Sequence, residues 1–184
     1  MSLRPGDGPL TWNVVGLLGD VAGAARTYPV AGVELDLGED VHLAQPIDGL
    51  VRLVRSNRGI LANAELSTAL TAQCSRCVKD IVVPIRLDLH EEFLPSLDVA
   101  TGKPVVVDDE PEALRLTDHH ELEFETTVRE AIWLAEPIAP VCRADCPGLC
   151  VVCGERQEAG DHDHQDADID PRLEALRAFR DPEA

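Results

Sequence analysis

The sequence predicts an α+β protein, mainly an antiparallel β-sheet with one or two helices and a Cys/His-rich extension near the C-terminal end. Three observations lead to this class. Long runs of alternating apolar and polar residues indicate strands with one buried face. One helical apolar period follows a pair of threonines and stops at proline. Six cysteines, four of them between positions 142 and 153, mark the extension.

The N-terminal part of the chain predicts short elements joined by turns. Residues 10–30 have the pattern of a short strand or helix followed by a turn. After the last short strand, Asn57-Arg58-Gly59 supplies a turn. Three short strands are expected in between, over residues 33–37, over residues 41–43 with an end near Pro46, and over residues 49–55.

The middle of the chain predicts a long antiparallel hairpin. One strand covers Ile60–Gln73 and the other covers residues 81–92. Pro84 indicates that the second strand is an edge strand or carries a bulge. Cys74 and Cys77 then lie at the hairpin tip. The residues expected on the buried faces are Ile60, Ala62, Ala64 and Leu66, and Val83, Ile85, Leu87 and Leu89.

Beyond the hairpin, residues 95–118 predict an acidic loop and residues 126–135 a helix. Thr126 or Thr127 is expected to cap this helix, and Pro137 and Pro140 to end it. Residues 142–164 are expected to be irregular and residues 165–171 to form an acidic linker. A final helix, opened by Pro171, is expected to contain Leu173, Leu176 and Phe179.

The charge balance restricts the possible partners. The chain of 184 residues has a formal net charge of −18, which argues against a free-standing nucleic-acid binder. The charge is uneven, however, because residues 52–87 hold six basic side chains against two acids and residues 88–125 hold twelve acids against two bases. The basic island consists of Arg52, Arg55, Arg58, Arg76, Lys79 and Arg86. It is either a surface for RNA phosphates or a solvated sheet face.

The N-terminus favours a cytosolic protein. Residues 12–18 are apolar and precede small residues, as in a secretory signal, but Asp7 precedes this stretch and Asn13 and Gly16 interrupt it. The sequence also contains no apolar run of 18 residues, so we expect no membrane-spanning helix.

The cysteine spacing predicts bound zinc. Two Cys-x-x-Cys turns, at Cys74/Cys77 and Cys150/Cys153, lie far apart in sequence, and glycine follows the second. The alternative roles for these cysteines are disulfides, a redox pair and an iron–sulfur cluster. The absence of a convincing signal disfavours disulfides, the flanking strands disfavour a redox motif, and the separate turns disfavour a cluster.

The ligand pairing stays open from spacing alone. Candidate ligands are Cys74, Cys77, Cys142, Cys146, Cys150, Cys153, His162 and His164, enough for two four-ligand sites. Either Cys142 and Cys146 join the first turn, or the two Cys-x-x-Cys turns meet as in a zinc ribbon. One site with spare thiols is a third possibility. Because so many thiolates can close the coordination shell, and the other histidines are scattered, we expect no enzyme.

Several motifs in fixed order resemble the YceD family, named for accumulation of large-subunit ribosomal RNA. The resemblance covers residues 10–180. The motifs are Cys74-Ser-Arg-Cys77, Glu91-Glu92-Phe93, Val128-Arg129-Glu130-Ala131-Ile132-x-Leu134-x-x-Pro137, Pro140-x-Cys142-x3-Cys146-x-Gly148-Leu149-Cys150-x-x-Cys153-Gly154 and Ile169-Asp170-Pro171-Arg172-Leu173.

The resemblance implies a cytoplasmic, non-enzymatic factor that supports large-subunit ribosomal RNA accumulation and ribosome assembly. Implied partners are the ribosomal RNA precursor, a ribosomal protein or both, with no membrane and no small-molecule substrate. The alternative is an acidic module that holds a basic ribosomal protein without touching RNA. Related sequences often carry Cys-x-Cys where His162 and His164 stand, so the comparison favours these histidines as ligands beside Cys150 and Cys153.

These expectations divide the chain into three parts. Residues 1–140 form a β-rich core domain that carries the first Cys-x-x-Cys hairpin, and residues 141–166 form the zinc-binding extension. Residues 167–184 supply the acidic linker and the C-terminal helix.

Overall fold

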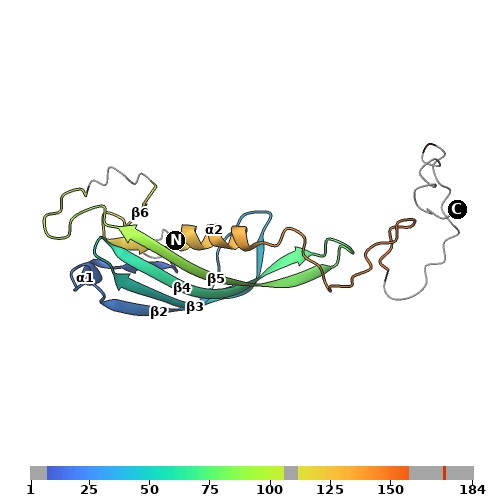
Figure 1. The fold of residues 1–184 in the computed structure, drawn as a ribbon, viewed down its shortest axis with the longest axis horizontal. Coiled ribbons are helices and arrows are strands. Elements are labelled where there is room, and N and C mark those ends of the chain that lie inside the picture. Colours follow the sequence, from blue (N-terminus) through green and yellow to red (C-terminus); the bar gives the residue numbers. More distant parts are fainter. Residues whose placement is uncertain (1–7, 106–111, 158–171, 173–184) are drawn as a thin grey trace, which may run out of the picture.

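The body of the protein is a five-stranded sheet in the order β2-β3-β4-β5-β6, accompanied by a two-stranded sheet of β1 and β7 (Figure 1). The computed structural model describes residues 8–105, 112–157 and 172. The α+β prediction is confirmed. The elements are β1 (Thr11–Asn13), α1 (Val15–Leu18), β2 (Ala25–Val33), β3 (His42–Arg55), β4 (Ile60–Gln73), β5 (Asp80–Leu94), β6 (Leu114–Arg115), β7 (Glu121–Glu123) and α2 (Glu125–Ala135).

The predicted long hairpin is present as β4 and β5. Strand β4 has the expected bounds, and its register with β5 runs unshifted from Ile60 opposite Phe93 to Gln73 opposite Asp80. Pro84 lies opposite Ala69, where β4 is the sheet neighbour of β5 and β6 does not reach, because β6 pairs with Phe93 and Leu94. The edge position predicted from Pro84 is therefore confirmed, and the bulge alternative is wrong.

The prediction of two strands separated near Pro46 is wrong, because β3 is one strand that passes through this proline. The pairing of β3 with β4 shifts register between Leu43 and Gln45 and again between Gln45 and Asp48. These irregularities tolerate a residue that cannot donate a ladder hydrogen bond. The hydroxyl of Thr68 donates to the Gln45 carbonyl at 2.7 Å and satisfies an acceptor there.

The strand expected over residues 33–37 is also displaced. Only Val33 belongs to β2, and residues 34–37 have no regular structure. They instead lie against α2, where Arg129 Nε donates to the Asp36 carbonyl at 3.1 Å and Trp133 Nε1 donates to the Leu37 carbonyl at 3.2 Å. These two carbonyl groups bond to side chains of α2 and so do not take part in a strand pairing.

Helix α2 covers one face of the sheet (Figure 1) and closes the main core. Its Val128 and Ile132 are fully buried in the same cluster as Ala62 and Ala64 of β4. The expected threonine cap is wrong, since Phe124 occupies the N-cap position without a side-chain cap. Phe124 is itself fully buried, and its backbone N–H donates to the Leu10 carbonyl.

The helix ends as expected before Pro137. Its C-cap, Glu136, has an extended backbone with ψ of 125°, the conformation that proline imposes on the residue before it. The described part of the expected acidic loop is largely irregular but contains β6, which pairs parallel with β5. The acidic linker at residues 165–171 and the helix expected after it lie outside the described residues, apart from position 172.

The proposed division at residues 140 and 166 stays a prediction. Among the described residues, neither helix has the length and apolar character needed to cross a membrane.

Candidate metal centre

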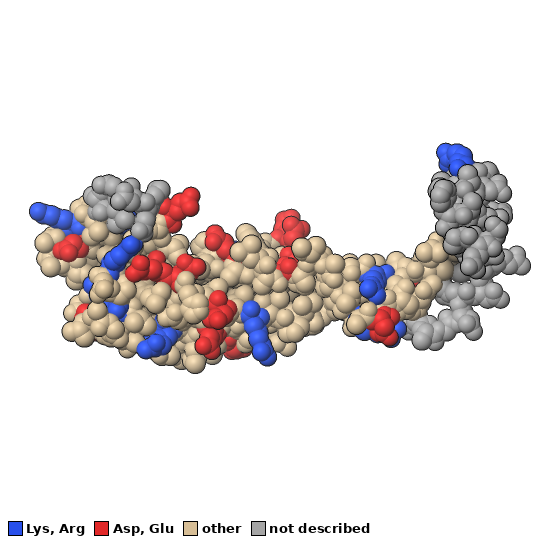
Figure 2. All heavy atoms as spheres, viewed as in Figure 1, with Lys and Arg blue, Asp and Glu red and all other residues tan. Residues whose placement is uncertain are grey.

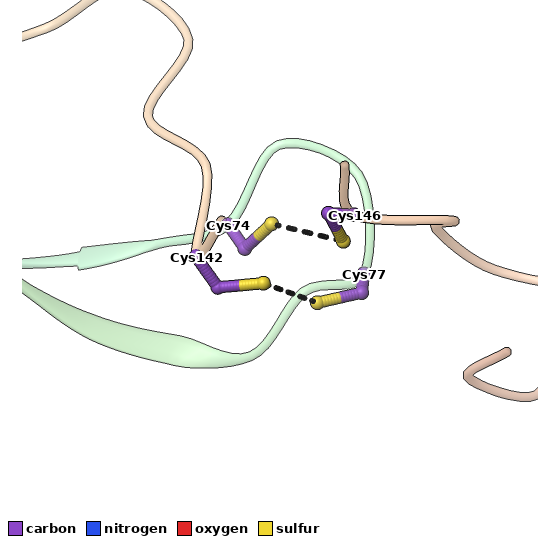
Figure 3. Close-up of side chains that lie close together, drawn as sticks. All are labelled: Cys74, Cys77, Cys142 and Cys146. Atoms are coloured by element: carbon purple, nitrogen blue, oxygen red, sulfur yellow. Dashed lines mark hydrogen bonds between the residues drawn. The ribbon is translucent and has the colours of Figure 1, made fainter. Parts of the chain in front are cut away.

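Two distant chain segments bring four cysteine thiols together (Figure 3). Cys74 and Cys77 lie at the tip between β4 and β5, and Cys142 and Cys146 lie in the segment after α2. Their Sγ atoms all lie within 4.8 Å of one another. The Cys74–Cys146 and Cys77–Cys142 Sγ pairs are each 3.8 Å apart, and all four cysteines are free.

These distances match one tetrahedral ion better than they match disulfides. Thiolates at about 2.3 Å from a tetrahedral zinc lie roughly 3.8 Å from each other. A disulfide requires about 2.05 Å between its sulfur atoms. Soft thiolate ligands are typical of zinc and iron sites. The four cysteines therefore could hold a metal ion.

The first Cys-x-x-Cys turn has a distinctive backbone. The N–H of Cys74 donates to the Lys79 carbonyl at 2.8 Å, and the N–H of Val78 donates to the Cys74 carbonyl at 2.9 Å. Val78 has a φ of 55°, in the left-handed region that a β-branched residue rarely adopts. The turn thus points both thiols to one side at the expense of local strain.

The second Cys-x-x-Cys turn repeats this backbone. The N–H of Cys150 donates to the Glu155 carbonyl at 2.7 Å, and the N–H of Gly154 donates to the Cys150 carbonyl at 2.9 Å. Gly154, with φ of 75°, takes the place of Val78. Cys150 is buried and Cys153 is exposed. The second turn therefore offers a second pair of thiols in the same geometry, apart from the four-cysteine group.

The structure does not bring all the candidate ligands together. Within the described residues, the four cysteines of the first group are the one set of three or more potential ligands found close enough to share an ion. The two Cys-x-x-Cys turns are not joined to one another as in a zinc ribbon. His162 and His164 lie outside the described residues.

Reciprocal arginine contacts join the extension to the hairpin tip. Arg76 Nη1, from the tip, donates to the carbonyls of Ala144 at 3.2 Å and Cys146 at 3.1 Å. Arg156, from the second turn, donates from Nε to the Cys77 carbonyl at 2.9 Å and from Nη2 to the Val78 carbonyl at 3.0 Å. Each arginine therefore fixes the segment opposite its own.

The apolar support at this junction is small. The buried cluster there consists of Cys74, Cys77 and Cys146 with the partly buried Ile81, and it is separate from the main core. With so little apolar surface to bury, a bound ion becomes an important source of folding free energy.

The thiols of the first group differ in acidity. Hydrogen bonds from the backbone of Cys142, and then of Cys77, lower the pKa of Cys74 to about 6. The hydrogen bond with Cys146, then burial and the Cys74 thiol, raise the pKa of Cys142 to about 12. A backbone hydrogen bond at Lys79 acts to lower the pKa of Cys77, but burial and the neighbouring thiols outweigh it and raise this pKa.

The second turn shows the same asymmetry. Backbone hydrogen bonds from Cys153 and Val152 lower the pKa of Cys150. For Cys153, burial and the Cys150 thiol outweigh a backbone hydrogen bond at Glu155, and the pKa rises. In each turn the first cysteine therefore has a lowered pKa and the second a raised one, and the thiolate is the form that binds metals.

The six residues of the predicted basic island lie in three separate places in the structure. Arg55 donates to the carbonyls of Leu18, Ser56 and Gly59, and Arg76 holds the extension. Arg58 Nε lies 3.7 Å from a carboxylate oxygen of Glu92.

The other three members of the island are Arg52, Lys79 and Arg86, which are exposed, as are Arg58 and Arg76. Arg52 and Arg86 lie on the open face of the sheet, where the acidic residue Glu65 of β4 lies between their cross-strand partners Asn63 and Ser67. Lys79 lies at the tip beside the cysteines. The six residues therefore do not form one continuous basic surface.

Sequence reasoning missed two basic residues at the tip. Arg143 and Arg156 line a cleft of about 510 Å³ together with Lys79 and the thiols of Cys77 and Cys142. Both arginines lie within the Cys-rich segment of the sequence. Their position beside the cysteines is the sequence feature that could have identified them. Their approach to Lys79 depends on the docking of that segment against the hairpin.

The fold and site define a β-rich protein in which a four-cysteine candidate metal centre joins a hairpin tip to a C-terminal extension. The model of the family described as "Large ribosomal RNA subunit accumulation protein YceD" matches residues 62–180. The chain therefore belongs to the YceD family. The matched region includes the hairpin, the four cysteines and the second turn.

Similar proteins occur in mycobacteria. Uncharacterized proteins of Mycobacterium tuberculosis and Mycobacterium bovis are 31% identical to the chain over 134 residues, which cover 73% of this chain and 62% of each relative. An uncharacterized protein of Mycobacterium leprae is 24% identical over 137 residues, or 74% of this chain and 60% of the relative. The chain thus matches less than two thirds of the length of these relatives. No solved structure matches the chain.

Proposed function

We propose that the protein is a non-enzymatic factor that supports large-subunit ribosomal RNA accumulation during ribosome assembly and contains structural zinc. The observation that carries this proposal is the four-cysteine group at the hairpin tip, within the region that matches the YceD family. The family description links the chain to large-subunit ribosomal RNA. The four-cysteine group supplies a rigid junction on which a binding surface can be built.

A structural role for the metal follows from its ligands. Four thiolates fill a tetrahedral zinc and leave no position for a reactive water. Cys74, Cys77, Cys142 and Cys146 are the proposed first set. We propose a second zinc at the repeated turn, bound by Cys150, Cys153, His162 and His164. The matching backbone geometry of the two turns supports this second set.

The proposed partner is the large-subunit ribosomal RNA precursor, with or without a ribosomal protein, in the cytoplasm. RNA contact requires basic side chains that remain available to phosphates. Arg52, Arg58, Lys79 and Arg86 of the basic island are the candidates, and of these four Lys79 is the one adjacent to the cysteine group. Arg55 and Arg76 contribute by stabilising the protein, because their guanidinium groups bind backbone carbonyls.

A nuclease experiment tests the proposed function. The tagged, zinc-loaded chain is sedimented with ribosomal particles from its host, with and without prior ribonuclease treatment. We expect it to migrate with the large-subunit precursor and to lose that association after treatment. Partner binding that survives ribonuclease supports the alternative of an acidic module for a basic ribosomal protein. Migration apart from precursor particles in both samples contradicts the proposed function.

A further inference from the structure

We propose that the cleft at the narrow end of the molecule, lined by Lys79, Arg143 and Arg156, binds phosphate groups of an RNA backbone. This inference rests on the proposed function and locates its RNA contact. The end is defined here as residues 74–80 and 140–157, and is called the tip module. The cleft has a volume of about 510 Å³ and also contains Cys142 and Gln157. Its size exceeds the space that a single metal ion needs.

The basic groups of the cleft are held in place before any ligand arrives. Arg156 uses Nε and Nη2 to bind the carbonyls of Cys77 and Val78, which fixes the plane of its guanidinium. The backbone of Lys79 is fixed because its carbonyl accepts the Cys74 N–H. Arg143 Nε lies 3.4 Å from Asp145 Oδ1. A preorganised arginine loses less conformational entropy when it binds a phosphate.

Charge separates the tip module from the rest of the molecule. The described residues outside it include eighteen acidic and nine basic side chains, whereas the tip module has three acidic and four basic ones. Figure 2 shows acidic and basic residues on the body, and basic residues together with an acidic one at the narrow end. A polyanion is repelled by the body and can approach the tip module. Among the described residues, this contrast favours contact at the tip module over contact along the sheet.

The acidic groups of the tip module do not cancel this contrast. They are Asp80, which accepts from Gln73, Asp145 beside Arg143, and Glu155. A divalent ion with four thiolates adds about two negative charges. Arg76 and Arg156 bind the carbonyls of Cys146 and Cys77 next to those thiolates and offset this charge. Lys79 then remains for an incoming phosphate, together with Arg143, which the phosphate shares with Asp145.

The composition of the tip module suits contact with the sugar–phosphate backbone of RNA more than contact with its bases. It contains no Phe, Tyr or Trp on which a base could stack. Phosphate contacts by Lys and Arg position an RNA without reading its sequence. The cleft is assembled from two segments, since Lys79 comes from the hairpin and both arginines come from the extension. Phosphate binding therefore requires the junction that the four cysteines form.

A matched charge reversal tests the inference. The zinc-loaded full chain is titrated with transcribed large-subunit ribosomal RNA at several salt concentrations. The tip variant is K79E/R143E, and the control is R26E/K103E, at exposed positions away from the tip, since Arg26 pairs with Leu53 and Lys103 follows the end of β5. Both variants change the net charge equally. A third variant, R52E/R86E, reverses two charges on the open sheet face.

We expect the tip variant to bind at least about tenfold more weakly and to lower the salt slope by roughly two contacts, while the control changes affinity less than about twofold. Equal affinity of tip variant and wild type overturns the inference, as does an equal loss in the sheet or control variant. In those cases the proposed function still holds if the wild type associates with the precursor in the nuclease experiment.

Folding of each variant is checked by zinc content and thermal unfolding. If K79E/R143E fails to retain zinc, K79Q/R143Q takes its place, since it removes the two charges without adding acids. For this neutral variant, a loss of affinity of at least about threefold supports the inference, and a smaller loss overturns it.

Discussion

At the residue scale, the function of each side chain depends on its partners as much as on its type. Cys74 and Cys142 are both thiols in one cluster, yet the pKa of the first is lowered to about 6 and that of the second is raised to about 12. Arg55 and Lys79 were equal members of a predicted basic island. The first now binds three carbonyls inside the fold and the second lines the tip cleft.

The two proposed zinc sites make a prediction about single cysteines. We expect about two zinc ions per chain in the wild type, and about one in both Cys74→Ser and Cys150→Ser, because each serine removes one thiolate from a different four-ligand set. Zinc and iron are counted by elemental analysis after purification without chelators. Iron in place of zinc, or loss of both ions in either variant, contradicts the proposed ligand sets. Ser75→Ala, beside a ligand, is the control and should keep both ions.

At the element scale, alternation of apolar residues predicted the long strands well, since burial of one face depends on local periodicity. Strand β4 has the predicted bounds, and Ile60, Ala62 and Ala64 are buried as expected. Expectations failed where a distant segment decided the outcome. Strand β3 continues past Pro46 because its register with β4 shifts there. Helix α2 begins after the buried Phe124, and no threonine caps it.

The repeated Cys-x-x-Cys turn makes a prediction about Val78. Val78→Gly should raise the midpoint of the thermal opening of this turn in the zinc-loaded protein, followed by hydrogen exchange of the Cys74 amide, which donates to the Lys79 carbonyl. Removing Cβ relieves left-handed strain, and after the entropic cost of glycine a gain of about 1 kcal/mol remains. Val78 is 46% exposed, so little packing is lost.

The matching control is Gly154→Ala, which imposes the strain that Val78→Gly removes. No heavy atom lies within 4 Å of a Cβ at Gly154, so the backbone φ of 75° alone sets its cost. We expect the turn of this variant to open at lower temperature. A midpoint that is unchanged or lower in Val78→Gly shows that the two turns do not share one geometry.

At the scale of the whole molecule, the protein has a large apolar core and a small, separate junction. The core between the sheet and α2 contains Phe93, Phe124 and Ile132, all nearly inaccessible to solvent. The junction depends on four thiols, two arginines and a hydrogen bond from the Ser75 N–H to the Pro140 carbonyl at 2.8 Å. The body can therefore remain folded when the junction opens.

Metal removal tests this independence. A strong chelator should abolish hydrogen-exchange protection at the Ser75 amide, which donates to the Pro140 carbonyl across the junction. The amides of the β3–β4 pairing should stay protected. Far-ultraviolet circular dichroism should change little. Cooperative loss of protection in β3 and β4 after chelation would falsify the idea that the metal stabilises the junction alone.

Local sequence was sufficient to predict the α+β class, the β4–β5 hairpin, the residue types that can bind a soft metal and the large excess of negative charge. These properties follow from local periodicity and side-chain chemistry. Tertiary structure alone decided that Cys142 and Cys146 meet Cys74 and Cys77, and that Arg143 and Arg156 join Lys79. The reason is that the lengths of the hairpin and α2, together with the face on which α2 packs, determine where the extension meets the tip.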